Sequence, residues 1–288
     1  MQYDRHSPFT RYLKSILTAP EMAADLQKAI TKLSVNQQTQ AKAALARVLE
    51  FDGKLSATSA DGALYQAFLQ ESAKQIFLDE LGPTDSPGWQ ALVHNADMSY
   101  SAQADHLTGR SDSPFWDDIA TAQKEDKAAI LARSLAAAQA YCEQRMGTDS
   151  RNWQWGKLHT YRWTSDATLM APFMSSSERA SIAAIKNYLD RGPFLAGGDH
   201  TTLNVSAYHW GENFDTWLTP AMRIIVDFNR EEPMNGHNSS GQSGNPASPH
   251  YADGIDAWRT GQYMSFPMQA KNQDRVYGKR GLLLLPEQ

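Results

Sequence analysis

The sequence predicts an α+β fold, with a mainly helical region over residues 1–150 and a strand-containing region over residues 151–288. In the first region, apolar residues recur at intervals of three and four, which is the period of a helix with one buried face. In the second region, alternating apolar and polar residues and a β-branched run are typical of strands.

Helices are expected in the first region where the apolar spacing is regular. The first begins at Pro20, because proline is tolerated in the first turn of a helix. Asp52-Gly53 ends the second helix, and Gly147 ends the last. Residues 98–120 are polar and rich in Ser and Asp, so we expect a loop with short turns there. The expected helices span residues 20–33, 41–48, 64–81 and 121–146.

Strands are expected at three places in the second region. Residues 155–163 and 201–209 alternate between apolar and polar side chains, and residues 224–226 are β-branched. Residues 229–250 hold many Pro, Gly, Asn and Ser residues, which favours a long tail loop. A short helix is expected over residues 253–263.

Composition and charge exclude several partners. The 288 residues are 41% hydrophobic and carry a formal net charge of −5 without long runs of one sign. We expect no nucleic-acid partner, because phosphate binding needs clustered Lys and Arg. We expect no membrane partner, because no apolar stretch approaches the length of a bilayer span. Cys142 is the single cysteine, which excludes an intrachain disulfide and favours a buried apolar role.

No complete catalytic arrangement can be assigned from the residues alone. The eight histidines are scattered, without the i, i+4 pairing or the Cys cluster of a zinc site, so we expect no metal ligands and no cofactor in this segment. Gly241-Gln242-Ser243-Gly244 fails the G-x-S-x-G pattern of a nucleophile elbow. Two glycines and two prolines make residues 239–251 a rigid loop, and we interpret it as a crossover between a strand and a helix.

The same loop carries a family resemblance. Residues 241–246, Gly-Gln-Ser-Gly-Asn-Pro, followed by Ser248-Pro249-His250-Tyr251 and Asp253, resemble the C-terminal signature of the penicillin acylase family. That family includes penicillin, cephalosporin and acyl-homoserine-lactone acylases. Trp155-Gly156-Lys157-Leu158-His159 resembles its W-G-x-L-H segment. Gly197-Gly198-Asp199 with Thr201–Asn204 resembles the family's G-G-D-x-x-T-x-N strand entry. Residues 220–227 resemble the strand just before the final loop, and Met1–Ser7 is similar to an M-Q-x-D-x-x-S helix.

The resemblance implies an N-terminal-nucleophile hydrolase with an αββα sandwich core. In that family a precursor cuts itself into a small and a large subunit, and the first residue of the large subunit attacks the amide. The matched part implies that this chain is the C-terminal piece of the large subunit, since Met1 cannot be the nucleophile. We therefore expect the chain to be inactive alone, with the remaining acylase segments and a small-molecule N-acyl substrate as partners. The resemblance also implies a periplasmic or secreted enzyme and a structural calcium in the complete protein, for which no ligand is transferred here.

Few residues of this chain take a role by resemblance. Asp227 matches a carboxylate that pairs with a histidine on sequence absent here; the alternative is a strand-end Asp that accepts backbone N–H groups. His159 is interpreted as a site residue or as a satisfied sheet histidine, and Asp199 as the closure of a turn. The motif positions are Trp155, Gly156, His159, Asp199, Asn204, Gly241, Gln242, Ser243, Gly244, His250 and Tyr251.

Two other hypotheses remain open on the sequence. One is a non-catalytic binding or scaffold protein that reuses the acylase C-terminal fold. The other is an unrelated serine hydrolase that uses Ser243. A sheet cut from a sandwich exposes an edge and an apolar face, so we also expect the chain to associate with partner segments or with itself.

Overall fold

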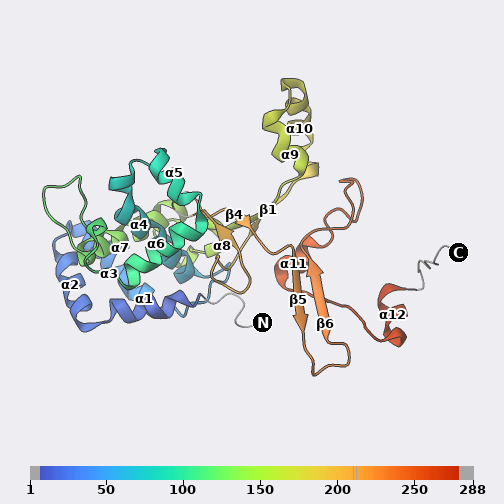
Figure 1. Cartoon of the computed structure of the whole chain (residues 1–288), viewed down its shortest axis with the longest axis horizontal. Helices are drawn as coiled ribbons and strands as arrows, with labels where there is room; N and C mark the ends of the chain where they lie inside the picture. Colours follow the sequence, from blue (N-terminus) through green and yellow to red (C-terminus); the bar gives the residue numbers. More distant parts are fainter. Residues whose placement is uncertain (1–6, 210, 212, 279–288) are drawn as a thin grey trace. The chain divides into compact units, whose positions relative to one another are not determined.

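The computed structural model describes residues 7–209, 211 and 213–278, and of residues 96–101 the backbone alone (Figure 1). Helices and strands are mixed, and the chain divides into two compact units. Unit 1 comprises residues 1–163 and 192–219, and unit 2 comprises residues 164–191 and 220–288. Each unit therefore combines two separate segments of the chain.

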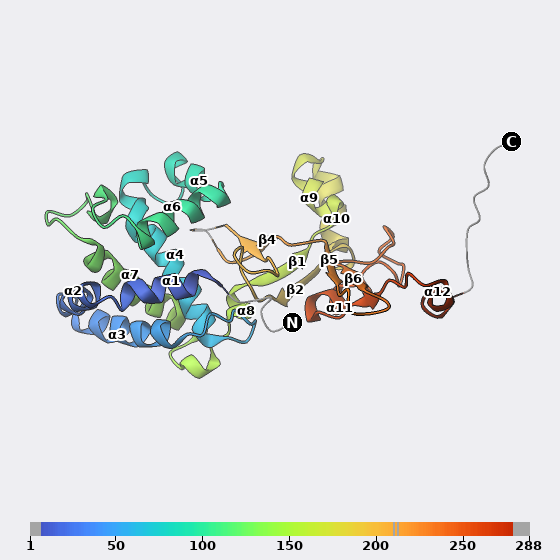
Figure 2. The same ribbon diagram turned by 60° about the horizontal axis from the view of Figure 1, so that its bottom comes forward.

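Unit 1 is built on a bundle of helices followed by short strands (Figures 1 and 2). Its helices are α1 (Phe9–Leu17), α2 (Pro20–Thr31), α3 (Val35–Glu50), α4 (Ala60–Leu81), α5 (Pro87–Val93), α6 (Ala96–Thr108), α7 (Lys127–Met146) and α8 (Trp155–Leu158), with 3-10 turns at Pro114–Trp116 and Ser150–Asn152. Its strands are β1 (Thr160–Trp163), β2 (Arg191–Leu195, whose first residue belongs to unit 2), β3 (Ala207–Tyr208) and β4 (Thr216–Leu218).

Helix α4 forms the centre of the unit 1 core. Its side chains are buried on nearly every face, Leu64 and Phe68 completely, which is the pattern of a helix surrounded by protein. Helix α7 packs against α2, α3 and α4. Ser59 caps α4 by accepting from the Gly62 N–H at 2.9 Å, and Asp126 caps α7 in the same way. The expected helices over 20–33, 41–48, 64–81 and 121–146 are thus confirmed with shifted ends, as is the burial of Cys142 on α7.

Unit 2 holds α9 (Asp166–Met170), a 3-10 turn (Ala171–Phe173), α10 (Ser176–Leu189), β5 (Met222–Val226), β6 (Met234–Asn238), α11 (Ile255–Thr260), β7 (Met264–Ser265) and α12 (Ala270–Tyr277). Strands β5 and β6 pair antiparallel from Met222 opposite Asn238 to Val226 opposite Met234, and β7 pairs with the other edge of β6. The strand over 224–226 and the short helix after the tail loop are confirmed.

On one face of the β5–β6–β7 sheet, Arg223 packs against Trp258 of α11. Its guanidinium lies 3.5 Å from the centre of the Trp258 ring, and its Nη1 donates to the Trp258 carbonyl. On the opposite face, Met222, Ile224 and Val226 are each about half exposed. Within unit 2, this face of the sheet therefore presents an apolar row that is only about half covered.

Three expectations were wrong in extent, and a fourth needs one addition. Residues 98–120 are not a loop, because α6 covers most of the first half. The buried His106 of this helix donates from Nδ1 to the Ala102 carbonyl at 2.8 Å, and its Nε2 lies 2.9 Å from the Ser113 hydroxyl. Residues 229–250 are mostly loop, as expected, but they include strand β6, which pairs with β5 despite its Asn and Gly content. Backbone pairing and buried polar contacts outweigh composition in both segments.

The alternating segments 155–163 and 201–209 are strands only at their C-terminal ends, β1 and β3. Residues Trp155–Leu158 form the helical turn α8 instead. Residues 200–204 turn around the Asp199 side chain, which accepts from the N–H groups of Thr201 and Thr202. The expected helix at Met1–Ser7 falls mostly outside the described residues, and Ser7 lies just before α1.

In the described residues, no helix is both long and apolar enough to cross a membrane. The strands of the same residues form three small sheets, with two, two and three strands.

Candidate functional site

The W-G-x-L-H segment is held against the N-terminal end of α4. The Trp155 N–H donates to the Ser59 carbonyl at 2.9 Å, and the Gly156 N–H donates to the Ala57 carbonyl at 2.7 Å. A Cβ atom at Gly156 would lie 2.7 Å from Leu195 Cβ and 3.0 Å from the Ala57 carbonyl oxygen. The close approach of two backbone segments therefore requires glycine at this position.

His159 is completely buried directly after α8. Its Nδ1 lies 2.5 Å from the Phe214 carbonyl oxygen, and its Nε2 lies 2.7 Å from the Ser206 hydroxyl. A carbonyl can only accept, so Nδ1 carries the proton and Nε2 accepts from Ser206. The ring stacks on Trp155 with the centres 4.6 Å apart. Burial lowers the pKa of the imidazole to about 4, so the ring is neutral at physiological pH.

The neutral His159 predicts a loss of stability in acid. The unfolded chain takes up a proton below the ordinary pKa of 6.5, whereas the folded chain does so only near 4, so the free energy of unfolding falls as the pH drops through this window. One pKa unit corresponds to about 1.4 kcal/mol, which makes the loss on the order of 3 kcal/mol. Urea titrations at pH 4–7 should show this slope in the wild type and a flatter slope in His159→Gln. His94→Gln, which changes an exposed histidine of the same unit, is the control and should keep the wild-type slope.

The G-G-D segment forms a second buried cluster in unit 1. Asp199 is 1% exposed and accepts from the Gln66 amide of α4 at 2.8 Å and from the Thr201 N–H at 2.8 Å. Gly198 has φ +84°, a conformation that favours glycine, and Asp199 closes the turn that follows it. Asn204 is buried, and its carbonyl accepts from the Thr202 hydroxyl at 3.0 Å.

The two segments meet in space. Trp155 Nε1 donates to the Gly198 carbonyl at 2.9 Å, and the Ala196 N–H donates to the His159 carbonyl at 2.9 Å. These contacts form one buried polar cluster between α4, α8 and the short strands, here called the buried joint. Its motif residues are Trp155, His159, Asp199 and Asn204. Each is at most 7% exposed, so this joint holds the fold and offers no group to a substrate.

The tail loop is tied across its base. The Gly241 N–H donates to the Tyr251 carbonyl at 3.2 Å, and the Ser243 N–H donates to the His250 carbonyl at 3.0 Å. The Tyr251 hydroxyl donates to the Leu189 carbonyl at 2.6 Å, and its ring lies under the Arg191 guanidinium at 5.0 Å. Gln242 and Gly244 lie exposed on the loop. The signature residues therefore fasten the loop to α10 and to its own return segment.

Ser243, His250 and Asp253 lie in the same loop without forming a triad. His250 Nδ1 is 2.9 Å from Asp253 Oδ2, and this contact lowers the pKa of the Asp253 carboxyl. The Ser243 hydroxyl accepts from the Asn245 N–H at 3.1 Å, while its only contact with His250 is through the backbone. A nucleophilic serine needs its hydroxyl on the imidazole, and the described contacts do not provide this.

The family model for penicillin amidase matches residues 1–275. The chain belongs to the penicillin amidase family. The resemblance drawn from the tail loop and the W-G-x-L-H segment is therefore confirmed. In this chain the two signatures lie in different units. In each of them, backbone N–H groups of the motif donate to backbone carbonyls of another segment.

Named relatives match almost the whole chain. It is 64% identical over 286 residues to an acyl-homoserine lactone acylase, QuiP, of Pseudomonas aeruginosa, and 55% identical to QuiP of Pseudomonas syringae pv. tomato. These alignments cover 99% of this chain and 34% and 33% of the relatives, so the chain spans about a third of the length of the curated relatives it matches. A thermostable penicillin G acylase from Alcaligenes faecalis aligns with 99% of this chain and 48% of its own, at 15% identity and a TM-score of 0.44.

Asp227, the carboxylate matched to the family's histidine partner, lies at the turn between β5 and β6. Its Oδ1 accepts from the Asn229 N–H at 3.1 Å, and its Oδ2 lies 3.1 Å from Arg230 Nε. Among the described residues these local groups, and no histidine, contact the carboxylate. The pairing with a histidine elsewhere in a penicillin amidase stays a prediction.

The described residues bring no three His, Cys, Asp or Glu side chains into a group that could hold a metal ion, so no calcium ligand is assigned to this chain. Cys142 is fully buried, and burial raises the pKa of its thiol to about 12, which keeps it unreactive.

Sequence reasoning missed three partners of the buried joint. Gln66 binds Asp199 from a position 133 residues away, and Ser206 and Phe214 bind His159 from 47 and 55 residues away. Gln66 was the one local indication of these contacts, because a glutamine inside an apolar helix is buried and its amide needs a polar partner.

Proposed function

We propose that this chain is part of an amidohydrolase that cleaves the N-acyl amide bond of an acyl-homoserine lactone. The supporting observation is the 64% identity, over 99% of the chain, to a relative named acyl-homoserine lactone acylase. Family membership supports amide hydrolysis as the reaction class. A β-lactam side chain is the other N-acyl substrate that the sequence resemblance allows.

In this proposal the nucleophile belongs to a part of the protein outside these residues. A hydroxyl attacks the amide carbon, the homoserine lactone leaves with a proton on its nitrogen, and water then releases the fatty acid from the acyl-enzyme. Two observations support an external nucleophile. His159 is buried and neutral, and the Ser243 hydroxyl has a backbone N–H rather than an imidazole as its partner.

The role proposed for this chain is to supply strands and a helical region to the αββα sandwich of the complete enzyme. The apolar row of β5 supports this role, because Met222, Ile224 and Val226 are about half exposed and Phe228, just beyond the strand, is 89% exposed. Such a row is costly in water and is covered when a second layer packs on it. Processing from a precursor, a periplasmic or secreted location and a structural calcium stay predictions.

The test is the activity of the 288-residue chain with and without the rest of the acylase. We expect no release of homoserine lactone from an N-acyl-homoserine lactone by the chain alone, and turnover when the missing segments of a QuiP relative are co-expressed with it. Ser243→Ala should leave the reconstituted turnover unchanged. Hydrolysis by the isolated chain that disappears in Ser243→Ala would contradict the proposal and favour a self-contained serine hydrolase.

A further inference from the structure

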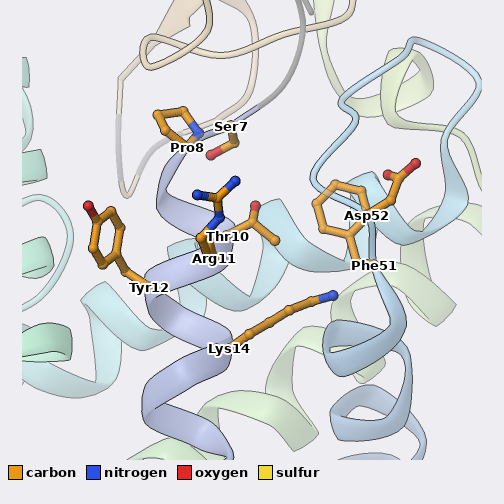
Figure 3. A pocket seen from close by; sticks show the side chains of 8 residues that line it. All are labelled: Ser7, Pro8, Thr10, Arg11, Tyr12, Lys14, Phe51 and Asp52. Carbon is orange, nitrogen blue, oxygen red and sulfur yellow. The ribbon is translucent and has the colours of Figure 1, made fainter.

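Two cavities of unit 1 differ in the charges that line them. The first, of about 550 Å³, lies beside α1, and its described lining has one carboxylate, Asp52, and the cations Arg11 and Lys14 (Figure 3). The second, of about 700 Å³, lies at the C-terminal end of α4, and the cation of its described lining is Lys124. The carboxyl groups that line this second cavity are Glu80, Asp112, Asp117, Glu125 and Asp126. Negative charge is therefore concentrated at the end of α4.

The wall of the second cavity is formed mostly by residues 109–126, the segment that joins α6 to α7 (green in Figure 1). Lys127, at the start of α7, is 6% exposed and joins the two ends of the segment, because its Nζ donates to the Leu107 carbonyl of α6 at 2.7 Å. The same Nζ lies 5.4 Å from the centre of the buried Trp116 ring. The 109–126 segment is therefore a loop closed at its base, with one large side chain packed inside.

A carboxylate fastens the outer part of the 109–126 segment to α4. Asp79 Oδ2 accepts from the Ile119 N–H at 2.8 Å. On the side of α7, the Arg133 guanidinium binds the carboxylates of Asp118 and Glu125. The segment is thus held between two helices by charged side chains, and its hydrogen bond to α4 uses an acceptor whose charge and surroundings depend on pH.

Glu80 lies beside this hydrogen bond, in a position that disfavours a second negative charge. Its carboxyl group is hydrogen-bonded to that of Asp79, which requires a proton on one of the two, because two carboxylates can only accept. Glu80 Oε2 is buried and has no donor among the described residues, so a proton of its own satisfies it. Both residues lie in the last turn of α4, which has no basic residue and carries the negative end of the helix dipole.

The proton on Glu80 is released near neutral pH. Burial, the hydrogen bond to Asp79 and the charges of Asp79 and Asp118 raise the pKa of Glu80 to about 7. The unfolded chain releases this proton near the ordinary value of 4.5, so the folded arrangement loses stability as the pH rises from there to about 7. A further titratable group packs against the same end of α4: the His106 ring of α6 lies 5.1 Å from that of Phe77.

We propose that the Asp79–Glu80 carboxyl pair is a proton-controlled latch, which holds the outer part of the 109–126 segment against α4 at mildly acidic pH and releases it above neutrality. With its proton, Glu80 donates to Asp79 and leaves the Asp79 carboxylate in place to accept from Ile119. Without it, Glu80 repels both Asp79 and Asp118, and Asp118 is the residue that precedes Ile119 on the segment. The latch does not depend on the acylase function.

The test is hydrogen exchange of the Ile119 amide in the 288-residue chain between about pH 5.5 and pH 8.5. The rate is expressed as a protection factor, because the intrinsic exchange rate also rises with pH. In the wild type we expect the protection factor to fall roughly tenfold or more across this range. In Glu80→Gln the amide donates to Asp79 at every pH and cannot ionise, so protection should stay high and level. In Asp79→Asn the fall should move to lower pH, because Glu80 loses its charged neighbour.

Two controls separate the latch from other titrations in unit 1. Glu50→Gln changes an exposed glutamate at the C-terminal end of another helix, α3, and should keep the wild-type fall. His106→Gln removes the nearby histidine, and the fall should persist there too, even if protection is lower throughout. Level protection in the wild type would overturn the proposal. A fall that remains in Glu80→Gln, or one that is lost in His106→Gln, would overturn it as well.

Discussion

Replacing Trp155 with alanine is expected to lower the free energy of unfolding of unit 1 by about 3–5 kcal/mol, the cost of deleting a fully buried large side chain. The indole contacts three other rings, with centre distances of 4.6 Å to His159, 5.1 Å to Phe214 and 5.9 Å to Tyr208. Its Nε1 also donates to the Gly198 carbonyl. Removing it opens a cavity at the point where the two family segments meet.

Trp155→Phe separates the loss of the hydrogen bond to Gly198 from the loss of ring packing. The phenyl ring keeps most of the packing and leaves the buried Gly198 carbonyl without its donor, which costs about 1–3 kcal/mol. Urea unfolding followed by far-ultraviolet circular dichroism reports on unit 1, because the longest helices belong to it. Trp217→Ala, at a half-exposed tryptophan, should change stability by less than about 1 kcal/mol. A loss below that level in Trp155→Ala would show that the joint does not stabilise the unit.

The helices could be predicted wherever the apolar spacing was enough to bury one face. That is why α2, α3, α4 and α7 were found, with errors of a few residues at ends that depend on caps such as Ser59 and Asp126. Helix α6 was missed because its inward side chains include Gln103 and His106, whose partners come from other segments. Strand β6 was missed because its pairing with β5 is made by backbone groups, which composition does not reveal.

For the candidate site, the sequence predicted the positions of the motif residues but not their contacts. The motif positions were found because the order of residues resembles a family, but their surroundings depend on contacts across the chain. The sequence offered no reason to place Gln66 on Asp199 or Ser206 on His159. Local chemistry did succeed at Asp199, because an Asp after a glycine closes a turn with its own following N–H groups.

Gly241→Ala is expected to open the tail loop, whereas Gly244→Ala, three residues away, should leave it closed. A Cβ atom at Gly241 would lie 1.9 Å from the His250 carbonyl oxygen and 2.6 Å from the Tyr251 carbonyl carbon. Both are backbone atoms, so the clash cannot be relieved by a side-chain rotation, and we expect a cost of about 1–3 kcal/mol or more. At Gly244 an added Cβ meets nothing within 4 Å. The pair therefore changes the same residue type in the same loop with opposite steric outcomes.

Amide hydrogen exchange measures the difference directly. In the wild type the amides of Gly241 and Ser243 donate to the carbonyls of Tyr251 and His250, so they should exchange slowly. A cost of about 1–3 kcal/mol raises their exchange roughly five- to 140-fold in Gly241→Ala, because each 1.4 kcal/mol is a factor of ten in the opening equilibrium. Gly244→Ala should keep the wild-type rates. If both variants exchange alike, the two sides of the loop are not in contact. The signature residues would then not act by closing the loop.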